Sequence, residues 1–265
     1  MAEPTTGPAF DPEVPHSARL WNYWLGGDDN FPVDRAIGDE IARRFPIIIE
    51  MARADRAFLQ RVVRYFVADK GIRQILDIGA GLPTADNTHQ VAQSIAPETR
   101  IVYVDNDPLV LAHAATLITS SSEGTAEYLE ADLNDPDRII SEARRRLDFD
   151  QPIAVMLLGV LHFVLDDDEA RSIVRRLVDA LPAGSYLALA VGCDDINREQ
   201  ADDIVSFWNE HGTPKIVYRS ATEIERCFDG LELLEPGVVP CSRWRPGPGG
   251  PGIDVNQYAG VGRKR

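Results

Sequence analysis

Residues 73–84 read RQILDIGAGLPT, and the fold of the chain follows from this stretch. Residues 75–78 form a mostly apolar, isoleucine-rich run of strand length, as expected for an inner strand that is covered on both faces. Gly79 and Gly81 end the run, and glycine there permits backbone turns that are closed to other residues and close approach of a ligand. An apolar stripe follows at residues 91–95, so the pattern predicts a strand, a glycine turn and a helix. These elements open a nucleotide-binding α/β unit.

The residues after the second glycine indicate which kind of nucleotide cofactor the turn can bind. A dinucleotide site would require a third glycine soon after Gly81, for close packing of helix on strand around a pyrophosphate. The chain instead reads LPTAD at residues 82–86. It also lacks the Gly-Lys-Ser/Thr end of a phosphate-binding P-loop. The stretch therefore favours a cofactor without a pyrophosphate, and a dinucleotide-dependent oxidoreductase is the weaker alternative.

Acidic residues follow the next two predicted strands. The strand at residues 100–104 ends at Asp105, where a carboxylate can accept two hydrogen bonds from a ribose diol. The third strand, near residues 126–130, ends at Asp132, which could bind an adenine amino group while Leu133 covers the ring. The alternative is that Asp105 begins a turn and Asp132 caps the next segment.

The chain resembles the core of a class I S-adenosylmethionine-dependent methyltransferase in four segments that occur in order: DIGAG, VDNDP, EADL and MLLGVLHFV. More narrowly, it is similar to a bacterial family of S-adenosyl methyltransferases once described as a domain of unknown function. The narrower similarity rests on HSARLWNYWLGGDDNFPVDR, ARADRAFLQRVVRY, LDIGAGLPT, VYVDNDPLVLAHA, LHFV, LPAGSYL and FDGLELLEPG. It runs from about His16 onward. Three departures from the family pattern concern Asp55, where asparagine is usual, Ala80, where threonine is usual, and AVGCDD, where a serine-histidine pair is common.

The resemblance implies an α/β fold with a Rossmann-like sheet of seven strands, mostly parallel with one antiparallel strand, and an N-terminal helical cap. It also implies S-adenosyl-L-methionine as the cofactor. Together with the pattern of the residues, it predicts a cofactor site that comprises Arg19, Tyr23, Gly26, Asn30, Asp77, Gly79, Ala80, Gly81, Asp105, Asn106, Asp132, Leu133, Gly159 and Val160.

Length and composition are those of a single α/β domain. The chain has 265 residues, of which 44% are hydrophobic, enough for one large core. A formal net charge of −15 disfavours nucleic acid and anionic membrane surfaces as partners. The three cysteines are widely spaced, which favours neither a disulfide framework nor a zinc site. With no apolar run of membrane-spanning length, a cytoplasmic location is expected. Nothing in the sequence indicates an oligomeric state.

Three regions are expected along the chain. Residues 1–15 are rich in proline, threonine and acidic side chains and are expected to be disordered. Residues 16–70 read as a helical cap, and residues 71–265 as the cofactor-binding domain. We expect the cap to close over the cofactor as a lid, with Arg19 pairing with the methionine carboxylate. The alternative is that its aromatic side chains only pack on the core.

His162 is the candidate catalytic residue. It follows the predicted fourth strand, at residues 153–158, and ligands of open α/β sheets bind outside the carboxyl ends of the strands. The side chain could act as a base or as a polar wall for the substrate. Alternatively, it packs under the loop and bonds a backbone carbonyl. The acidic run at residues 166–168 is better explained by helix capping than by a metal, and no metal is expected.

The predicted function is methyl transfer from S-adenosyl-L-methionine to an unidentified small-molecule substrate, by in-line displacement. No covalent enzyme intermediate is required, because positioning of the nucleophile in a water-poor pocket supplies most of the catalysis. The alternative from another class is a regulatory or sensing protein that binds S-adenosyl-L-methionine without turnover.

Overall fold

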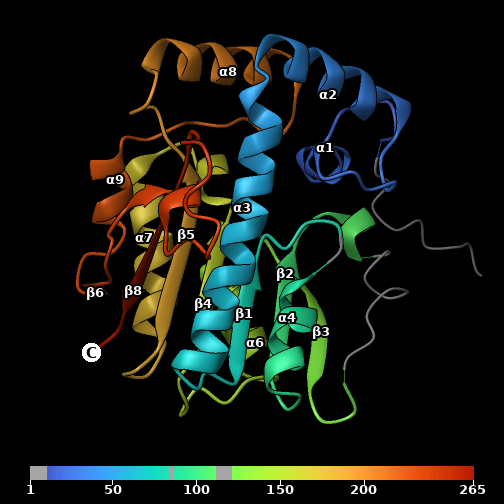
Figure 1. Ribbon diagram of the computed structural model, residues 1–265. Coiled ribbons are helices and arrows are strands. Elements are labelled where there is room, and N and C mark those ends of the chain that lie inside the picture. The colour runs from blue at the N-terminus through green and yellow to red at the C-terminus, as the bar shows by residue number, and fades with distance from the viewer. Residues whose placement is uncertain (1–10, 84–85, 112–120) are drawn as a thin grey trace, which may run out of the picture.

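A mixed sheet organises the computed structural model, which describes residues 11–83, 86–111 and 121–265 (Figure 1). The strands lie in the order β3-β2-β1-β4-β5-β8-β6, and β7 also pairs with β8. Their bounds are β1 (Gln74–Ile78), β2 (Arg100–Asp105), β3 (Thr125–Glu130), β4 (Ala154–Leu158), β5 (Tyr186–Gly192), β6 (Glu232–Leu233), β7 (Val239–Pro240) and β8 (Gln257–Arg263).

Strand direction agrees with the sequence-based prediction. The strands β3, β2, β1, β4 and β5 are mutually parallel, whereas β8 runs antiparallel to β5, β6 and β7. The mostly parallel sheet with one reversed strand is therefore confirmed. Eight strands rather than seven are present in the described residues, because Val239 and Pro240 add a short pairing to β8.

Helices cover both faces of this sheet (Figure 1). Their bounds are α1 (Ser17–Trp24), α2 (Pro32–Arg44), α3 (Ile47–Arg64), α4 (Thr88–Ile95), α6 (Pro136–Ala143), α7 (Asp167–Asp179), α8 (Arg198–His211) and α9 (Ala221–Arg226). A π-helical turn, Tyr65–Asp69, continues α3. Short 3-10 turns lie at Leu161–Phe163 and Cys241–Arg243.

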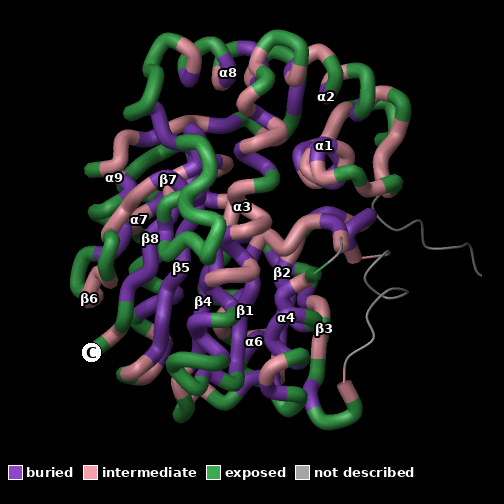
Figure 2. The backbone as a smooth tube through the Cα atoms, in the orientation of Figure 1, coloured by how far each residue is buried: buried purple, intermediate pink, exposed green. Residues whose placement is uncertain are grey.

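Alternation along the strands divides the core into two layers. In β1, Ile75 belongs to the cluster that includes α3 and α4, whereas Leu76 and Ile78 belong to the cluster that includes α6 and α7. Successive side chains of a strand point to opposite faces, so each strand contributes to both layers. The tube in Figure 2 is accordingly buried along the central strands. A strand buried on both faces explains the continuous apolar run at β1.

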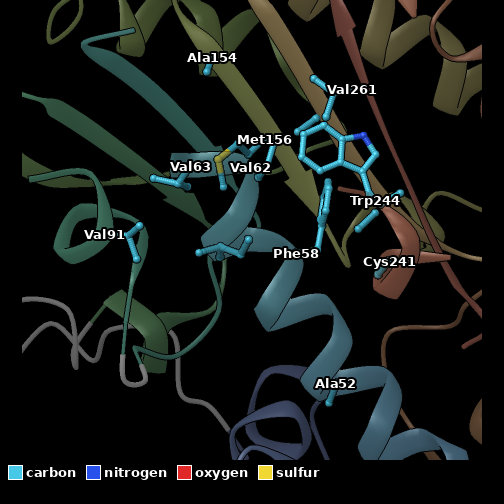
Figure 3. Close-up of a cluster of buried hydrophobic side chains, with 14 of the residues drawn as sticks. Ala52, Phe58, Val62, Val63, Val91, Ala154, Met156, Cys241, Trp244 and Val261 are labelled. Atoms are coloured by element: carbon cyan, nitrogen blue, oxygen red, sulfur yellow. The ribbon is translucent and has the colours of Figure 1, made fainter. Parts of the chain in front are cut away.

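The helices of segment 16–70 lie in two different places relative to the sheet. Helix α3 lies on the sheet, where Phe58 packs edge-on against Trp244 with ring centroids 5.3 Å apart (Figure 3). Helices α1 and α2 instead stand at the end of the sheet where the parallel strands finish (Figure 1). Helix α8 lies beside the end of α2, and Phe45 contacts Phe207 there at 6.4 Å between ring centroids.

The N-terminal stretch and the search for membrane-spanning helices can be described only for the described residues. Residues 1–10 of the N-terminal stretch expected to be disordered lie outside the described residues. Within the described ranges, no helix combines the length and the apolar character needed to cross a membrane.

Candidate functional site

A cavity of about 320 Å³ lies where the parallel strands end, beneath α1 and beside α3. Strand order reverses at β1, which has β2 on one side and β4 on the other, and open α/β sheets bind ligands at such a point. Ten of the predicted cofactor residues line this cavity: Asp77, Gly79, Ala80, Gly81, Asp105, Asn106, Asp132, Leu133, Gly159 and Val160. They come from the ends of four strands that are separated in sequence.

The glycine turn after β1 brings backbone close to the cavity. Gly79 has a φ of 76° and Gly81 a φ of 63°, a region that favours glycine. The Gly79 N–H donates to the carbonyl of Val104 over 2.8 Å, which ties the turn to β2. A Cβ atom at Gly79 would lie 2.5 Å from Cγ2 of Val160, so glycine is also required there by the close approach of the loop after β4.

We expect Gly79→Ala to lower the free energy of unfolding by about 2–3 kcal/mol, since strain at positive φ adds to overpacking against Val160. Gly71→Ala is the matched control, because Gly71 also has a positive φ but a Cβ atom added there would meet nothing within 4 Å. Urea unfolding of both variants measures the difference. Equal losses in the two variants would show that Val160 moves aside at no cost.

Asp105 has the turn role that was weighed for it, and both Asp105 and Asp132 line the cavity. Asp105 accepts hydrogen bonds from the N–H of Gly81 at 2.8 Å and from the N–H of Asp107 at 2.9 Å. Asp132 accepts from the N–H of Asn134 at 2.8 Å and from the side chain of Asn106 at 3.1 Å, whereas Asp135 caps the next helix. Each carboxylate therefore organises its own turn and also lines the cavity. Since a carboxylate has about four lone-pair sites, these bonds leave acceptor capacity for a ligand.

Three ionisable side chains lie at the α3 side of the cavity: Asp55, Arg56 and Asp77. Only Asp77 was part of the predicted site. Asp77 is buried and accepts a hydrogen bond from the Thr88 hydroxyl at 2.6 Å. Asp55 accepts one from the side-chain amide of Gln257 at 3.2 Å. Burial raises the pKa of Asp55 and of Asp77 to about 6.

Arg56 is the third of these side chains. It is the only arginine or lysine among the described residues that line the cavity. Its guanidinium donates to the side-chain oxygen of Asn87 at 3.0 Å, and burial lowers its pKa from the usual value. Both Asp55 and Arg56 lie in ARADRAFLQRVVRY, one of the segments that carry the family resemblance. Their place in that segment is the feature of the sequence from which Asp55 and Arg56 could have been predicted as site residues.

The raised pKa of the half-buried Asp55 carboxyl predicts that stability depends on pH. A folded-state pKa near 6, above the ordinary 3.8, means that the folded protein binds more protons than the unfolded chain between these pH values. Stability should therefore rise as pH falls from 6 toward 4. At pH 7.5 the ionised carboxylate is unfavourable, and we expect Asp55→Asn to raise the free energy of unfolding by about 1 kcal/mol.

Urea unfolding at pH 7.5 and at pH near 4 would measure this effect, with the exposed Asp203→Asn on α8 as control. The gain from Asp55→Asn should disappear at the lower pH. A loss of stability at pH 7.5 would contradict the prediction and would mean that Asp55 is stabilised there as an anion.

Four predicted site residues from the N-terminal segment do not line the cavity: Arg19, Tyr23, Gly26 and Asn30. Arg19 is buried, with its Nε 2.7 Å from Oδ2 of Asp34, so the predicted contact with a methionine carboxylate is not available to it. Tyr23 donates to Asp39 at 2.7 Å, and Asn30 donates to the carbonyl of Gly27 at 2.8 Å. The segment that contains these four residues does border the cavity, but through other side chains.

The cavity is lined by Ala18, Trp21 and Asn22 of α1 and by Leu25, which caps the C-terminal end of that helix. These positions are spaced by three and four residues, as expected for one side of a helix. Arg19 lies on another side, which packs toward α2.

His162 is buried in the 3-10 turn after β4 and does not line the cofactor cavity. It lines a second, smaller cavity nearby. Burial, together with the Arg219 charge, lowers the pKa of His162 to about 3. The ring is therefore neutral at physiological pH and a weak base. Its Nδ1 has no hydrogen-bond partner among the described residues, so the expected bond to a backbone carbonyl is not formed by that atom.

A family model described as S-adenosyl methyltransferase matches residues 4–265. The chain belongs to this family. It is an S-adenosylmethionine-dependent methyltransferase, and the family resemblance inferred from the sequence is confirmed. The comparison with curated proteins gives no match.

Solved structures support membership of the S-adenosyl methyltransferase family. A DUF574 family protein from Streptomyces avermitilis is 41% identical, with a TM-score of 0.92 over 96% of this chain and 99% of that one. A protein described as a putative methyltransferase from Thermobifida fusca is 38% identical, with a TM-score of 0.87 over 96% of each chain. An S-adenosylmethionine-dependent methyltransferase from Anabaena variabilis, 18% identical with a TM-score of 0.51 over 94% of this chain and 93% of that one, shares the fold.

The cavity of this methyltransferase fits its cofactor, S-adenosyl-L-methionine. Gly79 and Gly81 line the cavity without side chains, and a Cβ atom added at Gly81 would meet no protein atom within 4 Å. Carboxylates at the ends of β1 and β2 and one guanidinium from α3 supply partners for a ligand with hydroxyl, ammonium and carboxylate groups.

Proposed function

We propose that the chain transfers the methyl group of S-adenosyl-L-methionine to a small-molecule acceptor. The observation that carries this proposal is that α1 covers the cavity at the strand ends, with Trp21 and Leu25 in its lining. A pocket roofed by a helix suits a small acceptor better than a polymer. The net charge of −15 also disfavours nucleic acid as the acceptor.

Roles for the lining residues follow from their chemistry. Asp105 accepts from the ribose diol, as a carboxylate at the end of the second strand does in adenosine-binding folds. Asp132 bonds the adenine amino group, and Leu133 covers the ring. Arg56 pairs with the methionine carboxylate, in place of Arg19. Asp77 lies at the glycine turn and accepts from the methionine ammonium group.

When bound, S-adenosyl-L-methionine supplies an electrophilic methyl on a sulfonium that a nucleophile can attack in line. The chain then has to hold the acceptor in the attacking direction and keep water out. Trp21, Leu25 and Leu59 provide apolar surface for that exclusion. We propose further that α1 and α2 act as a lid, since cofactor and acceptor must enter beneath α1.

Calorimetry with S-adenosyl-L-methionine, S-adenosylhomocysteine, NAD and NADP tests the cofactor assignment. The first two are expected to bind and the last two are not, because the third glycine of a pyrophosphate site is absent. NAD binding without a response to S-adenosyl-L-methionine would contradict the proposal. Formation of S-adenosylhomocysteine with a methylated acceptor separates an enzyme from a sensing protein that releases its ligand unchanged.

Arg56→Met tests the role of the guanidinium in the same experiment. We expect a loss of cofactor affinity of about 10- to 100-fold, the scale of hydrogen bonds to a charged group. Arg53→Met is the matched control on α3, since Arg53 is exposed and pairs only with Glu50 among the contacts described. Equal affinity in the two variants would show that Arg56 serves packing rather than binding.

A further inference from the structure

One carboxylate of the cofactor cavity has no part in the proposed binding of the cofactor. The described lining contains four aspartates and one arginine: Asp55, Asp77, Asp105, Asp132 and Arg56. Asp105 and Asp132 are assigned to the adenosine, and Asp77 and Arg56 to the charged groups of the methionine part. Asp55 has no assigned partner in the cofactor, although its ionised form is unfavourable for stability. A perturbed carboxylate in a cavity is commonly kept for function at the expense of stability.

Asp55 faces the cavity from α3. Ala52 and Leu59, which lie three positions before it and four after it, line the same cavity, so this face of the helix is turned toward the ligand space. Asp55 is half-buried, and its Oδ1 accepts from the side-chain amide of Gln257 at 3.2 Å. Within the described structure this carboxylate accepts no other hydrogen bond, which leaves acceptor capacity for a ligand.

Gln257 fixes the place of Asp55 relative to the strand ends. Gln257 begins β8 and pairs with Gly192, the last residue of β5. Its side-chain nitrogen lies 3.8 Å from the position that a Cβ atom of Gly159, just after β4, would take. Asp55 is therefore held near the ends of β4 and β5, on the opposite side of β1 from the ends of β2 and β3.

The strand order gives the direction in which the cofactor extends. With adenine at the end of β3 and ribose at the end of β2, the sulfonium comes farther along the same edge of the sheet, toward β1 and β4. Its methyl group then lies on the side of the cavity where Asp55 is held. Since an acceptor has to reach this methyl group, Asp55 borders the space that the attacking atom occupies.

The charge of the lining favours a basic acceptor. Aspartates outnumber the single guanidinium of the described lining, and the net positive charge of the cofactor offsets only part of this excess when the carboxylates are ionised. An anionic acceptor would be repelled from such a cavity, whereas a basic nitrogen would be attracted. A neutral alcohol would gain little from the same charge.

We propose that Asp55 is a catalytic residue that binds the methyl acceptor, and that the acceptor is an amine whose attacking nitrogen donates a hydrogen bond to the Asp55 carboxylate. This inference rests on the proposed methyltransferase activity and names its acceptor class. The lone pair of the neutral nitrogen forms the N–C bond while the C–S bond breaks and its electron pair stays on sulfur. The positive charge moves from the sulfonium to the nitrogen beside Asp55, so the carboxylate stabilises the charge that develops in the transition state.

Sinefungin tests the placement of Asp55 on the full chain. In this analogue of S-adenosyl-L-methionine, a carbon that carries an amino group replaces the sulfonium and its methyl, so a cationic nitrogen lies where the methyl is transferred. S-adenosylhomocysteine has no charge there. Calorimetry at pH 7.5 should show that Asp55→Asn weakens sinefungin by roughly tenfold or more, the scale of a hydrogen bond between charged groups, and leaves S-adenosylhomocysteine little changed.

Asp132→Asn is the matched control for this comparison. It removes a carboxylate of the same cavity at the adenosine end, and therefore should change the affinities for sinefungin and S-adenosylhomocysteine by the same factor. The control separates a local contact at Asp55 from the general loss of one negative charge in the lining. Binding of S-adenosylhomocysteine also shows that each variant is folded.

Saturation-transfer NMR tests the acceptor class on the chain saturated with S-adenosylhomocysteine. We use ethylamine, ethanol and acetate, which are similar in size and differ in charge. Ethylamine should bind roughly tenfold more tightly than ethanol or acetate, without displacing S-adenosylhomocysteine. Asp55→Asn should abolish this preference, whereas Asp132→Asn should retain it.

Different results count against different statements. Equal losses of sinefungin and S-adenosylhomocysteine in Asp55→Asn would place Asp55 at the methionine part of the cofactor and overturn its role toward the acceptor, and unchanged affinity for both ligands would overturn it as well. Equal binding of ethylamine and ethanol, or no binding of ethylamine, would overturn the amine as acceptor. Failure of S-adenosylhomocysteine to bind the unaltered chain would instead contradict the proposed function.

Discussion

Asp34→Ala is expected to lower the free energy of unfolding by about 3–5 kcal/mol, the usual cost of removing one partner of a buried ion pair. Asp34 is fully buried and lies 2.7 Å from Nε of Arg19, which is itself 2% exposed. The same carboxylate accepts from the N–H of His16 at 3.1 Å and of Phe31 at 2.9 Å. Alanine would leave a buried guanidinium and two backbone donors without these acceptors.

Urea unfolding gives the size of this loss. Asp39→Ala on the same helix is the control, because Asp39 is exposed and accepts only from the Tyr23 hydroxyl among the bonds described. The double variant Arg19→Met with Asp34→Ala should recover part of the loss, since no unpaired charge then remains buried. A loss below about 1 kcal/mol in Asp34→Ala would show that water reaches Arg19 easily.

Asp34→Ala also tests the proposed lid. The Arg19 pair joins α1 to α2, and α1 covers the cofactor cavity. If the helices act as a lid, cofactor affinity should fall along with stability, and S-adenosylhomocysteine should no longer protect residues 16–44 from proteolysis. Unchanged affinity in a variant whose helices are cleaved rapidly would show that α1 serves packing alone.

Asp105→Ala is expected to weaken cofactor binding by roughly 10- to 150-fold, equivalent to about 1.5–3 kcal/mol for hydrogen bonds to a charged group. Two effects act together. The ribose loses its acceptor, and the N–H groups of Gly81 and Asp107 lose theirs, so that the glycine turn is less well ordered. Burial raises the pKa of the Asp105 carboxyl, which implies that affinity should also fall at acidic pH.

Asp135→Ala separates binding from stability. Asp135 caps α6 by accepting from the N–H of Arg138 at 3.1 Å, and it lies outside the residues that line the cofactor cavity. Calorimetry should show normal affinity for S-adenosylhomocysteine in Asp135→Ala despite some loss of stability. Similar affinities in Asp105→Ala and Asp135→Ala would mean that Asp105 is a turn residue only.

Local pattern was sufficient for the first strand with its glycine turn and for the acidic residues that follow β2 and β3. The apolar run at β1 and the acidic residues after β2 and β3 depend on neighbours within a few positions, and chain direction then brings the strand ends together. The short β7 was not predicted, because two residues carry no period and Pro240 opposes a strand assignment.

The sequence by itself determined the strand, glycine turn and helix and the acidic residues that follow the next two strands, because short-range periodicity and the positions of glycine and acidic residues indicate them. The mostly parallel sheet and the other cavity residues at its strand ends were predicted with the help of the family resemblance, which is also carried by the sequence. Only the tertiary structure decided which face of α1 meets the cavity, that Arg56 rather than Arg19 lines it, and that His162 borders a separate apolar cavity. Those outcomes depend on contacts between segments far apart in sequence. Arg19 has its partner in Asp34 on another helix, and a buried cation must take the partner that packing provides.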